Sequence, residues 1–468
     1  MFWSCPFIFG TAFPREAEKN EGQCHESLKQ YGVCIACRYF FDGTANNQFN
    51  ILSGRERQAR GLKVEPGSSY AGEPTNIARL HRHYPVQTTF KDSQALTSLY
   101  VGGIGTTTGA VDTSFPGLTY GRGRTGVLGK ADEALEQLSQ CLAQFLRLAP
   151  ANALSRLQLD LFGFSRGAAA ARHFANQVHA TAFTQQFALA SDFKCSIEFI
   201  GLFDTVAAMG GLEDLGDVGD DINPGLNLYL GPECAQQVVQ LCARDEQRRN
   251  FSLTRIAPQW PLDIFLPGVH ADLGGGYPVE MQEQVQLTRW QSNLVSPSTP
   301  IRLTSAWKLA QAQLLDWQAR DLIDPLAEQD FVQVRTEEQK AGSRQDPMKR
   351  VQAAVFMQRR VLGHLSRVYL RIMHSLACKQ GVPFAALNSA QDALPDELLP
   401  IAARLEAQVL KSTIKLTPAQ ERLLRQRYVH QSANFNANVG QGLGVLDKAF
   451  FNIAQEGGRN VFEQKPPV

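Results

Sequence analysis

The sequence predicts an α/β fold with a mainly parallel sheet and helices on both of its faces. Strand-like apolar runs alternate with amphipathic helical segments across residues 31–290, and this alternation favours β-α-β units. The apolar run at 157–164 leads into a glycine-flanked serine and then into an alanine-rich segment. Acidic and histidine residues follow later strand-like runs. Open α/β sheets collect their functional residues at that carboxyl edge.

Each element is predicted from its own periodicity. Continuous apolar runs of strand length indicate buried strands, whereas apolar residues recurring every three or four positions indicate a helix. The segment before the serine has Leu135, Leu138, Leu142 and Phe145 on one helical face. The runs that we interpret as strands are 32–41, 98–101, 157–164, 196–203 and 262–266.

The pentapeptide at 163–167, Gly-Phe-Ser-Arg-Gly, is typical of the nucleophile elbow of α/β-hydrolases. Such an elbow puts the serine on a sharp turn between a strand and a helix. Gly163 and Gly167 leave room for the two backbones to pass closely, and the helix N-terminus can stabilise negative charge. The pentapeptide alone also occurs by chance. With its strand and its small-residue helix, it predicts that Ser165 is the nucleophile of a serine hydrolase.

A nucleophilic serine needs a general base and a carboxylate that orients the base. In this fold the chain order is serine, acid, histidine. Asp204 ends one strand-like run, and His270 lies on a Gly/Pro-rich loop after another. These settings predict a triad of Ser165, Asp204 and His270. The alternatives are that Asp204 merely caps the next segment and that His430 is the base.

The loop after the first strand begins Asp42-Gly43-Thr44. An oxyanion hole in this fold combines the amide after the nucleophile, here Arg166, with an amide from an earlier strand's loop. We expect Gly43 or Thr44 to supply the second donor, and Asp42 to hold the loop in shape. One such donor lowers the barrier by about 3 kcal/mol. The alternative is an ordinary Asp-Gly turn.

Several blocks, in this order, resemble the bacterial type VI secretion lipase effectors, a hydrolase family long catalogued only as a domain of unknown function. The resemblance implies an α/β-hydrolase fold, phospholipase A activity and the same triad, Ser165, Asp204 and His270. It also favours a supporting role for Asp272. Between 279 and 427 little is similar, so elements that gate the substrate cannot be inferred. The blocks are 41–47, 163–167, 203–206 and 267–277, with 428–433 resembling the family's closing motif.

The resemblance also implies a biological setting. The protein would be an antibacterial effector, carried by a spike or tube protein of the type VI machinery and neutralised by a cognate immunity protein. Its substrate would be membrane glycerophospholipid, reached from the target-cell periplasm. Two alternatives are a soluble carboxylesterase or thioesterase acting on small acyl substrates, and a catalytically silent hydrolase-fold module that works by binding.

Composition agrees with a globular enzyme. The 468 residues are 44% hydrophobic and carry a net charge of +1, which gives no general attraction to nucleic acid. No run approaches 18 apolar residues, so we expect no transmembrane span. The apolar start at 1–10 lacks a basic region and a small-residue cleavage site, so it is a poor secretory signal. We therefore expect synthesis in the bacterial cytoplasm and delivery by another route.

Three regions are expected along the chain: an irregular lead-in at 1–30, a catalytic core at 31–290, and a mainly helical cap at 300–468. The cap would return to the core near 428–437. The Ser/Pro-rich stretch at 291–300 is interpreted as a linker.

The segment 349–379 contains seven Lys/Arg residues and no Asp or Glu, with apolar residues at helical spacing. This pattern predicts a basic amphipathic helix. Such a helix lies on an anionic membrane, or packs in the core with its basic side solvated.

We expect no cofactor. Cys34 and Cys37 form the only close cysteine pair, and residues three apart on a strand point to opposite faces, which argues against zinc. The acidic, glycine-rich loop at 213–221 lacks the spacing of an EF-hand. Calcium at this loop is the alternative to a solvated loop.

Overall fold

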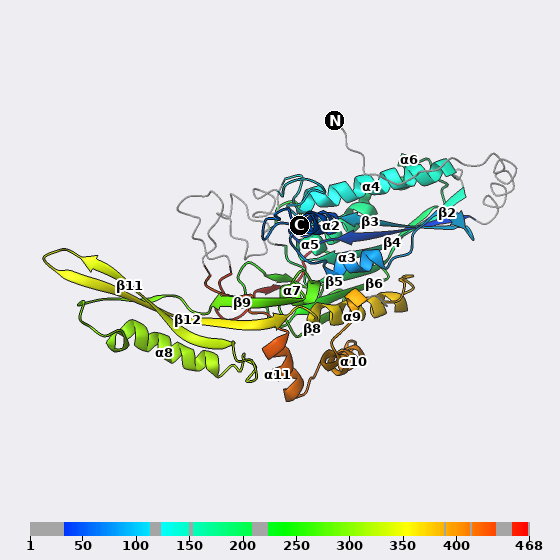
Figure 1. Ribbon diagram of the computed structural model, residues 1–468. Coiled ribbons are helices and arrows are strands. Elements are labelled where there is room, and N and C mark those ends of the chain that lie inside the picture. The colour runs from blue at the N-terminus through cyan, green and yellow to red at the C-terminus, as the bar shows by residue number, and fades with distance from the viewer. Residues whose placement is uncertain are drawn as a thin grey trace.

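The computed structural model describes residues 32–112, 123–148, 153–207, 223–387, 390–411, 414–436 and 452–466. A seven-stranded sheet lies at its centre, in the order β2-β3-β1-β4-β5-β6-β8 (Figure 1). Only β2 is antiparallel to its neighbour, so the predicted α/β class with a mainly parallel sheet is confirmed. The strands are β1 (Val33–Phe41), β2 (Gln87–Lys91), β3 (Gln94–Val101), β4 (Leu154–Phe164), β5 (Lys194–Phe203), β6 (Gln237–Ala243) and β8 (Asp263–Leu266).

Helices cover both faces of this sheet (Figure 1). On one face, α4 (Val127–Leu148) and α5 (Arg166–Ala180) bury their apolar sides against the strands. On the other face, α3 (Asn76–Arg82) and α9 (Leu365–Lys379) do the same. Coverage of both faces explains why the strands read as continuous apolar runs rather than alternating ones. Further helices outside the second sheet are α2 (Gln48–Ala59), α6 (Phe183–Gln186), α7 (His270–Gly274), α10 (Leu399–Gln408) and α11 (Pro418–Arg427).

The strand register aligns the ends of the three central strands. Gly163, near the end of β4, is level with Phe41 of β1 and Leu202 of β5. Parallel strands all end at the same edge, so the segments after β1, β4 and β5 emerge side by side. Asp42, Ser165 and Asp204 are therefore brought to one place by sheet topology.

A second sheet forms an arm that projects from the body (Figure 1). The long hairpin of β11 (Phe331–Gly342) and β12 (Pro347–Leu362) is its main part. β12 also pairs with β9 (Glu280–Gln286) and β10 (Gln291–Val295). Helix α8 (Ser305–Gln318) packs along the hairpin and buries Ala306, Ala310 and Leu314. Short 3-10 turns complete the region: η3 (Ile301–Leu303), η4 (Ala390–Asp392) and η5 (Asp396–Leu398).

The expected domain division needs three corrections. Residues 300–468 contain the arm hairpin in addition to their helices, and α9 from this region packs on the central sheet rather than in a separate cap. The expected linker at 291–300 contains β10. The predicted basic helix at 349–379 is also wrong in its first half, which is strand β12, and only its second half is α9.

The misassignment of β12 has a physical origin. Every second side chain from Val351 to Val361 is buried, as expected for a strand, and Ala354 between them is buried too. Val351 and Val355 are also four residues apart, which is a spacing typical of one face of a helix. Arg359 interrupts the apolar alternation in the sequence, yet its side chain is only 1% exposed. Arg367 of α9 is buried as well, so these two arginines do not form a basic outer face.

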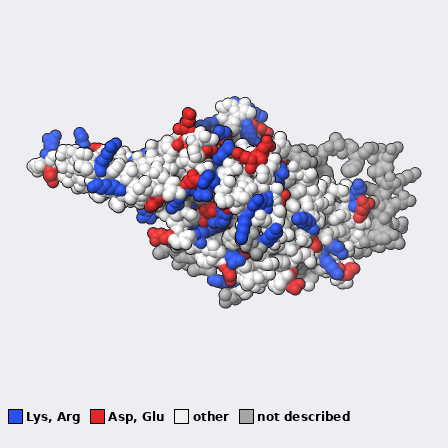
Figure 2. All heavy atoms as spheres, turned by 90° about the horizontal axis from the view of Figure 1, so that it is seen from below, with Lys and Arg blue, Asp and Glu red and all other residues white. Residues whose placement is uncertain are grey.

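Two segments considered from sequence lie outside the described residues: the lead-in at 1–30 and the acidic loop at 213–221. The closing motif is described as far as residue 436 and lies against the core, with Tyr428 fully buried. None of the described helices is both long and apolar enough to cross a membrane. Lys/Arg and Asp/Glu residues are interspersed over the face shown in Figure 2.

Candidate active site

Ser165 occupies a strained turn between β4 and α5. Its backbone angles are φ 58° and ψ −128°, a conformation that costs energy for a residue with a side chain. A Cβ at Gly163 would lie 2.5 Å from Ala168 Cα, and one at Gly167 would lie 2.2 Å from the Asp42 carbonyl oxygen. Both flanking glycines are therefore required by close backbone approach. The Ser165 side chain makes no capping bond to α5.

Asp204 and His270 form a buried pair. His270 Nδ1 lies 2.5 Å from Asp204 Oδ2, and both side chains are almost fully buried. The Ala243 amide donates to Asp204 Oδ1 at 2.8 Å, which fixes the carboxylate. Because Nδ1 carries the proton shared with Asp204, Nε2 is the acceptor nitrogen in the neutral imidazole. Burial lowers the pKa of His270, although Asp204 opposes this shift.

Ser165 is a close neighbour of this pair. Its amide donates to the carbonyl of Phe203, the residue before Asp204, at 3.0 Å. The ring of Phe164 lies 4.7 Å from the His270 ring, centroid to centroid. No hydrogen bond joins the Ser165 hydroxyl to His270 within the described residues. In enzymes without substrate such bonds are often long and tighten only in the complex.

Aromatic rings enclose the imidazole of His270. Phe164 is tilted against one side, and Phe251 meets the ring edge-on at 4.8 Å. The Arg248 guanidinium lies over the Phe251 ring, 3.4 Å from its centroid. These apolar walls exclude water and strengthen the electrostatic interactions inside. Sequence analysis did not single out Phe251, since a lone phenylalanine in a polar loop carries no recognisable pattern.

Glu246 is a second residue that the sequence did not indicate. Its buried carboxylate accepts from the His270 amide at 3.2 Å and pairs with Arg248 at 2.9 Å. The Ser432 hydroxyl donates to the same carboxylate at 2.9 Å. Burial raises the pKa of Glu246, but Arg248 outweighs it and holds the value at about 2. Glu246 thus ties the His270 loop to the closing motif.

Arg459 is the third residue missed, and it contacts the candidate triad directly. Its guanidinium bonds both oxygens of Asp204, each at 2.8 Å. Burial alone raises the pKa of Asp204, yet Arg459 and His270 hold it well below its ordinary value. Because Arg459 lies 255 positions from Asp204 in the chain, no local pattern reveals the contact.

The rival histidine has a different partner. His430 Nδ1 lies 2.6 Å from Asp272 Oδ1, and Tyr277 stacks on the imidazole at 3.7 Å. Asp272 also accepts from the Val269 amide at 3.0 Å, next to His270. His430 therefore pairs with Asp272 rather than with Asp204, and Asp272 braces the turn that carries His270.

Asp42 is bonded to three groups around the loop after β1. Its buried carboxylate accepts from Thr75 Oγ1 at 2.6 Å and from the Tyr100 hydroxyl. The Gly43 amide donates to the same carboxylate at 2.7 Å, so Gly43 is already committed and is a poor oxyanion donor. Burial raises the pKa of Asp42 to about 6, against its hydrogen bonds.

Thr44 has the better geometry of the two candidate donors. Its amide donates to no acceptor in the part of the chain that the structure describes. Its side-chain oxygen accepts from Arg166 Nε at 2.8 Å. This bond links the loop after β1 to the first residue of α5. The two loops expected to form an oxyanion hole are therefore in contact.

Metal ligands do not cluster in the described residues. No group of three or more His, Cys, Asp or Glu side chains is arranged there to hold an ion. The loop 213–221, where calcium was the alternative, falls outside those residues.

Fold and site together define an α/β-hydrolase-like protein, and the comparisons with known proteins agree. A model of the catalytic domain of Tle1-like type VI secretion phospholipase effectors matches residues 177–296, which include Asp204 and His270. The solved structure of the Tle1 effector bound to the VgrG spike of the type VI system matches with a TM-score of 0.72. Sequence identity to it is 28%, over 92% of this chain and 94% of that chain.

A crystal structure of an uncharacterized protein from Pseudomonas aeruginosa is also similar, with a TM-score of 0.44 and 19% identity. That match covers 88% of this chain and 56% of the other. No curated protein matches the sequence. The predicted resemblance to the type VI secretion lipase effectors is confirmed, and with it the main functional prediction, a phospholipase effector of that system.

Proposed function

We propose that the protein is a serine hydrolase of the phospholipase A type, which cleaves acyl ester bonds of membrane glycerophospholipids. The observation that carries this proposal is Ser165 on a strained elbow beside a buried Asp204–His270 pair. Strain of this kind persists only where the surrounding structure enforces it, and it is common at active sites.

In the proposed mechanism, Ser165 Oγ attacks the acyl carbonyl while His270 Nε2 takes its proton. The amides of Arg166 and Thr44 stabilise the oxyanion. Gly43 does not take this role, because its amide donates to the Asp42 carboxylate. The tetrahedral intermediate then collapses, which breaks the ester bond, and His270 gives the proton to the lysolipid as it leaves. Water then hydrolyses the acyl-enzyme with the same base. Asp204 orients the imidazole and stabilises it when it is charged.

The biological setting is part of the proposal. The similar Tle1 effector was solved bound to the VgrG spike, which supports a spike protein as the carrier of this chain. An immunity protein in the producing cell and action on membrane phospholipid from the target periplasm are further elements of the proposal. Both follow from the sequence resemblance.

The test uses vesicles of phospholipids with a different acyl chain at each position. Wild type is expected to release lysolipid and free fatty acid, and the chain released distinguishes sn-1 from sn-2 cleavage. Ser165→Ala should retain less than about a hundredth of the rate, because loss of a triad member costs far more than that. Its circular dichroism should be unchanged.

Two other outcomes would replace the proposal. Fast cleavage of short-chain nitrophenyl esters without lysolipid formation would favour a soluble esterase. Failure of a fluorophosphonate probe to label Ser165 would favour a binding module with a hydrolase fold.

A further inference from the structure

We propose that Arg459 is a positioning residue of the active site: docked by the terminal strap, it clamps the Asp204 carboxylate in the orientation that holds the His270 imidazole. We define the terminal strap as residues 452–466. This inference rests on the proposed function, because it concerns the same triad. Arg459 lies outside every sequence motif that contains a residue of the triad.

The contact between Arg459 and Asp204 has the geometry of a two-point clamp. Nη1 and Nη2 of Arg459 each lie 2.8 Å from a different oxygen of Asp204. Nε of the same guanidinium donates to the Phe251 carbonyl, which fixes its plane. The side chain of Arg459 is 6% exposed and that of Asp204 is fully buried. Planar bidentate pairs of this kind impose direction as well as charge.

The terminal strap is anchored on both sides of Arg459. Its strand β13 (Val461–Phe462) runs parallel to β7 (Leu253–Thr254). Before Arg459, the Arg249 amide donates to the Ile453 carbonyl at 3.0 Å. After it, the buried side chain of Gln464 accepts from Arg172 Nη2 at 2.8 Å and donates to the Ile256 carbonyl at 2.7 Å.

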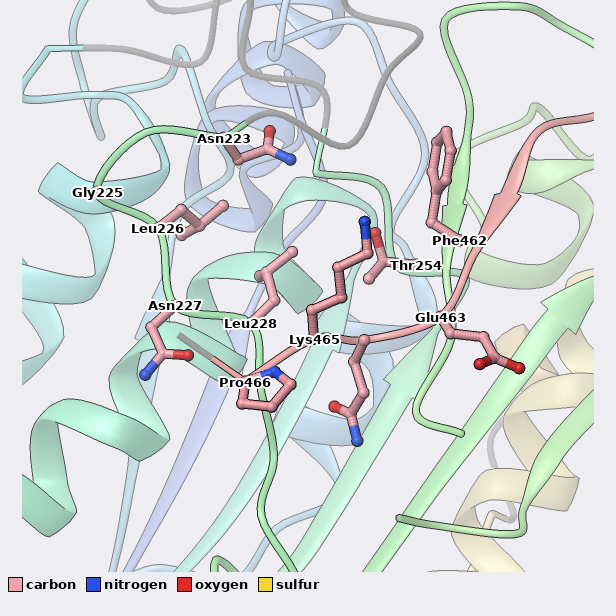
Figure 3. A pocket seen from close by; sticks show the side chains of 11 residues that line it. Asn223, Gly225, Leu226, Asn227, Leu228, Thr254, Phe462, Glu463, Lys465 and Pro466 are labelled. Carbon is pink, nitrogen blue, oxygen red and sulfur yellow. The ribbon is translucent and has the colours of Figure 1, made fainter. Parts of the chain in front are cut away.

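The outer part of the terminal strap faces a pocket rather than the triad. Figure 3 shows residues 462–466 on one side of this pocket, with Leu226 and Leu228 across from them. The pocket holds about 410 Å³. The side chain of Glu463 is 64% exposed there. Glu463 therefore provides a control variant in the terminal strap that leaves the Arg459 clamp intact.

The charge of Arg459 acts on both members of the pair. A buried carboxylate without a partner tends to become protonated, and Arg459 opposes this at Asp204. Burial lowers the pKa of His270 most, Asp204 opposes this, and the positive charges of Arg248 and then Arg459 lower it further. Arg459 therefore favours a charged Asp204 and adds to burial and Arg248 in favouring a neutral His270, the state in which His270 accepts the serine proton.

The test compares Arg459→Gln and Arg459→Lys in the full chain. The readout is the rate of fluorophosphonate labelling of Ser165 as a function of pH, together with kcat/KM on a dispersed short-chain ester. Arg459→Gln should lower both rates at least tenfold. It should also move the acid limb of each pH–rate profile to higher pH, because His270 loses a repelling charge and Asp204 loses its counter-charge.

Arg459→Lys keeps the charge but loses the two-point clamp. Its acid limb should stay close to that of wild type while the rate falls. Guanidinium ion, at concentrations far below those that unfold the protein, should partly restore Arg459→Gly. Glu463→Gln, in the same strap, should behave as wild type. A pH–rate profile of Glu463→Gln like that of wild type would show that a substitution elsewhere in the terminal strap does not shift the acid limb.

An Arg459→Gln enzyme that loses activity with an unshifted acid limb would reduce Arg459 to a structural role and overturn the inference. Unchanged rates would overturn it as well. Failure of the proposed function looks different, because wild type itself would then not be labelled at Ser165.

Discussion

His430 donates from Nδ1 to Asp272 at 2.6 Å, and Asp272 lies on α7, the helix that begins with His270. The protein therefore has two buried Asp–His pairs that share one short helix. Only the pair with Asp204 adjoins Ser165. The other connects the closing motif to α7 and so supports the turn that presents His270.

Replacing the two histidines should separate these roles. His270→Ala should remove activity as completely as Ser165→Ala, because nucleophile and base act as one unit. His430→Ala should keep substantial activity but lower the free energy of unfolding by about 2 kcal/mol, the contribution of a buried hydrogen bond to a charged group. Ester hydrolysis and urea denaturation measure the two effects. An inactive His430→Ala beside an active His270→Ala would reverse the assignment.

Glu246 predicts how acid affects stability. Its pKa of about 2 in the folded protein lies below the ordinary value, so its contribution is complete above about pH 4.3, the unfolded value. That contribution, about 3 kcal/mol, is lost as pH falls from there toward 2. Urea unfolding as a function of pH should show this loss in wild type and a flatter profile in Glu246→Gln. Parallel profiles would contradict the assignment.

Arg359 and Arg360 are neighbours on β12 with opposite environments, and they form a matched pair. Arg359 is buried and bonds Glu283 at 2.8 Å and the Val429 carbonyl at 2.7 Å. The side chain of Arg360 is 59% exposed. Arg359→Gln should destabilise the protein by about 3 to 5 kcal/mol, because it leaves Glu283 buried without its partner. Arg360→Gln should be neutral in thermal denaturation. A stable Arg359→Gln with weakened vesicle binding would restore the membrane role considered from sequence.

Chelation tests the remaining alternative of calcium at loop 213–221. The proposed mechanism uses only protein groups, so EDTA should leave vesicle hydrolysis unchanged. Loss of activity in EDTA, restored by added calcium, would require a metal in the mechanism.

The central sheet and the candidate triad could be predicted because their signals are local. Buried strands read as apolar runs, and the elbow around Ser165 needs glycines where backbones meet. The same local method fails where a signal depends on distant partners. Arg359 breaks the apolar alternation of β12 because its partners come from β9 and the closing motif. Its charge therefore suggested an exposed helix face.

The oxyanion loop could not be resolved from sequence, because Gly43 and Thr44 are adjacent and both follow the same strand. The structure distinguishes them by a local detail of geometry, the bond from the Gly43 amide to the Asp42 carboxylate. Glu246, Phe251 and Arg459 each surround His270 or Asp204 without any motif of their own. Residues of this kind are found by their contacts.

The terminal strap makes the candidate site depend on residues far apart in the chain. Asp204 and Arg459 are separated by 255 positions, and closing so long a loop costs chain entropy. A chain that has formed its central sheet but has not added β13 leaves the Asp204 carboxylate without its counter-charge. We therefore expect recovery of activity during refolding to lag behind formation of the sheet.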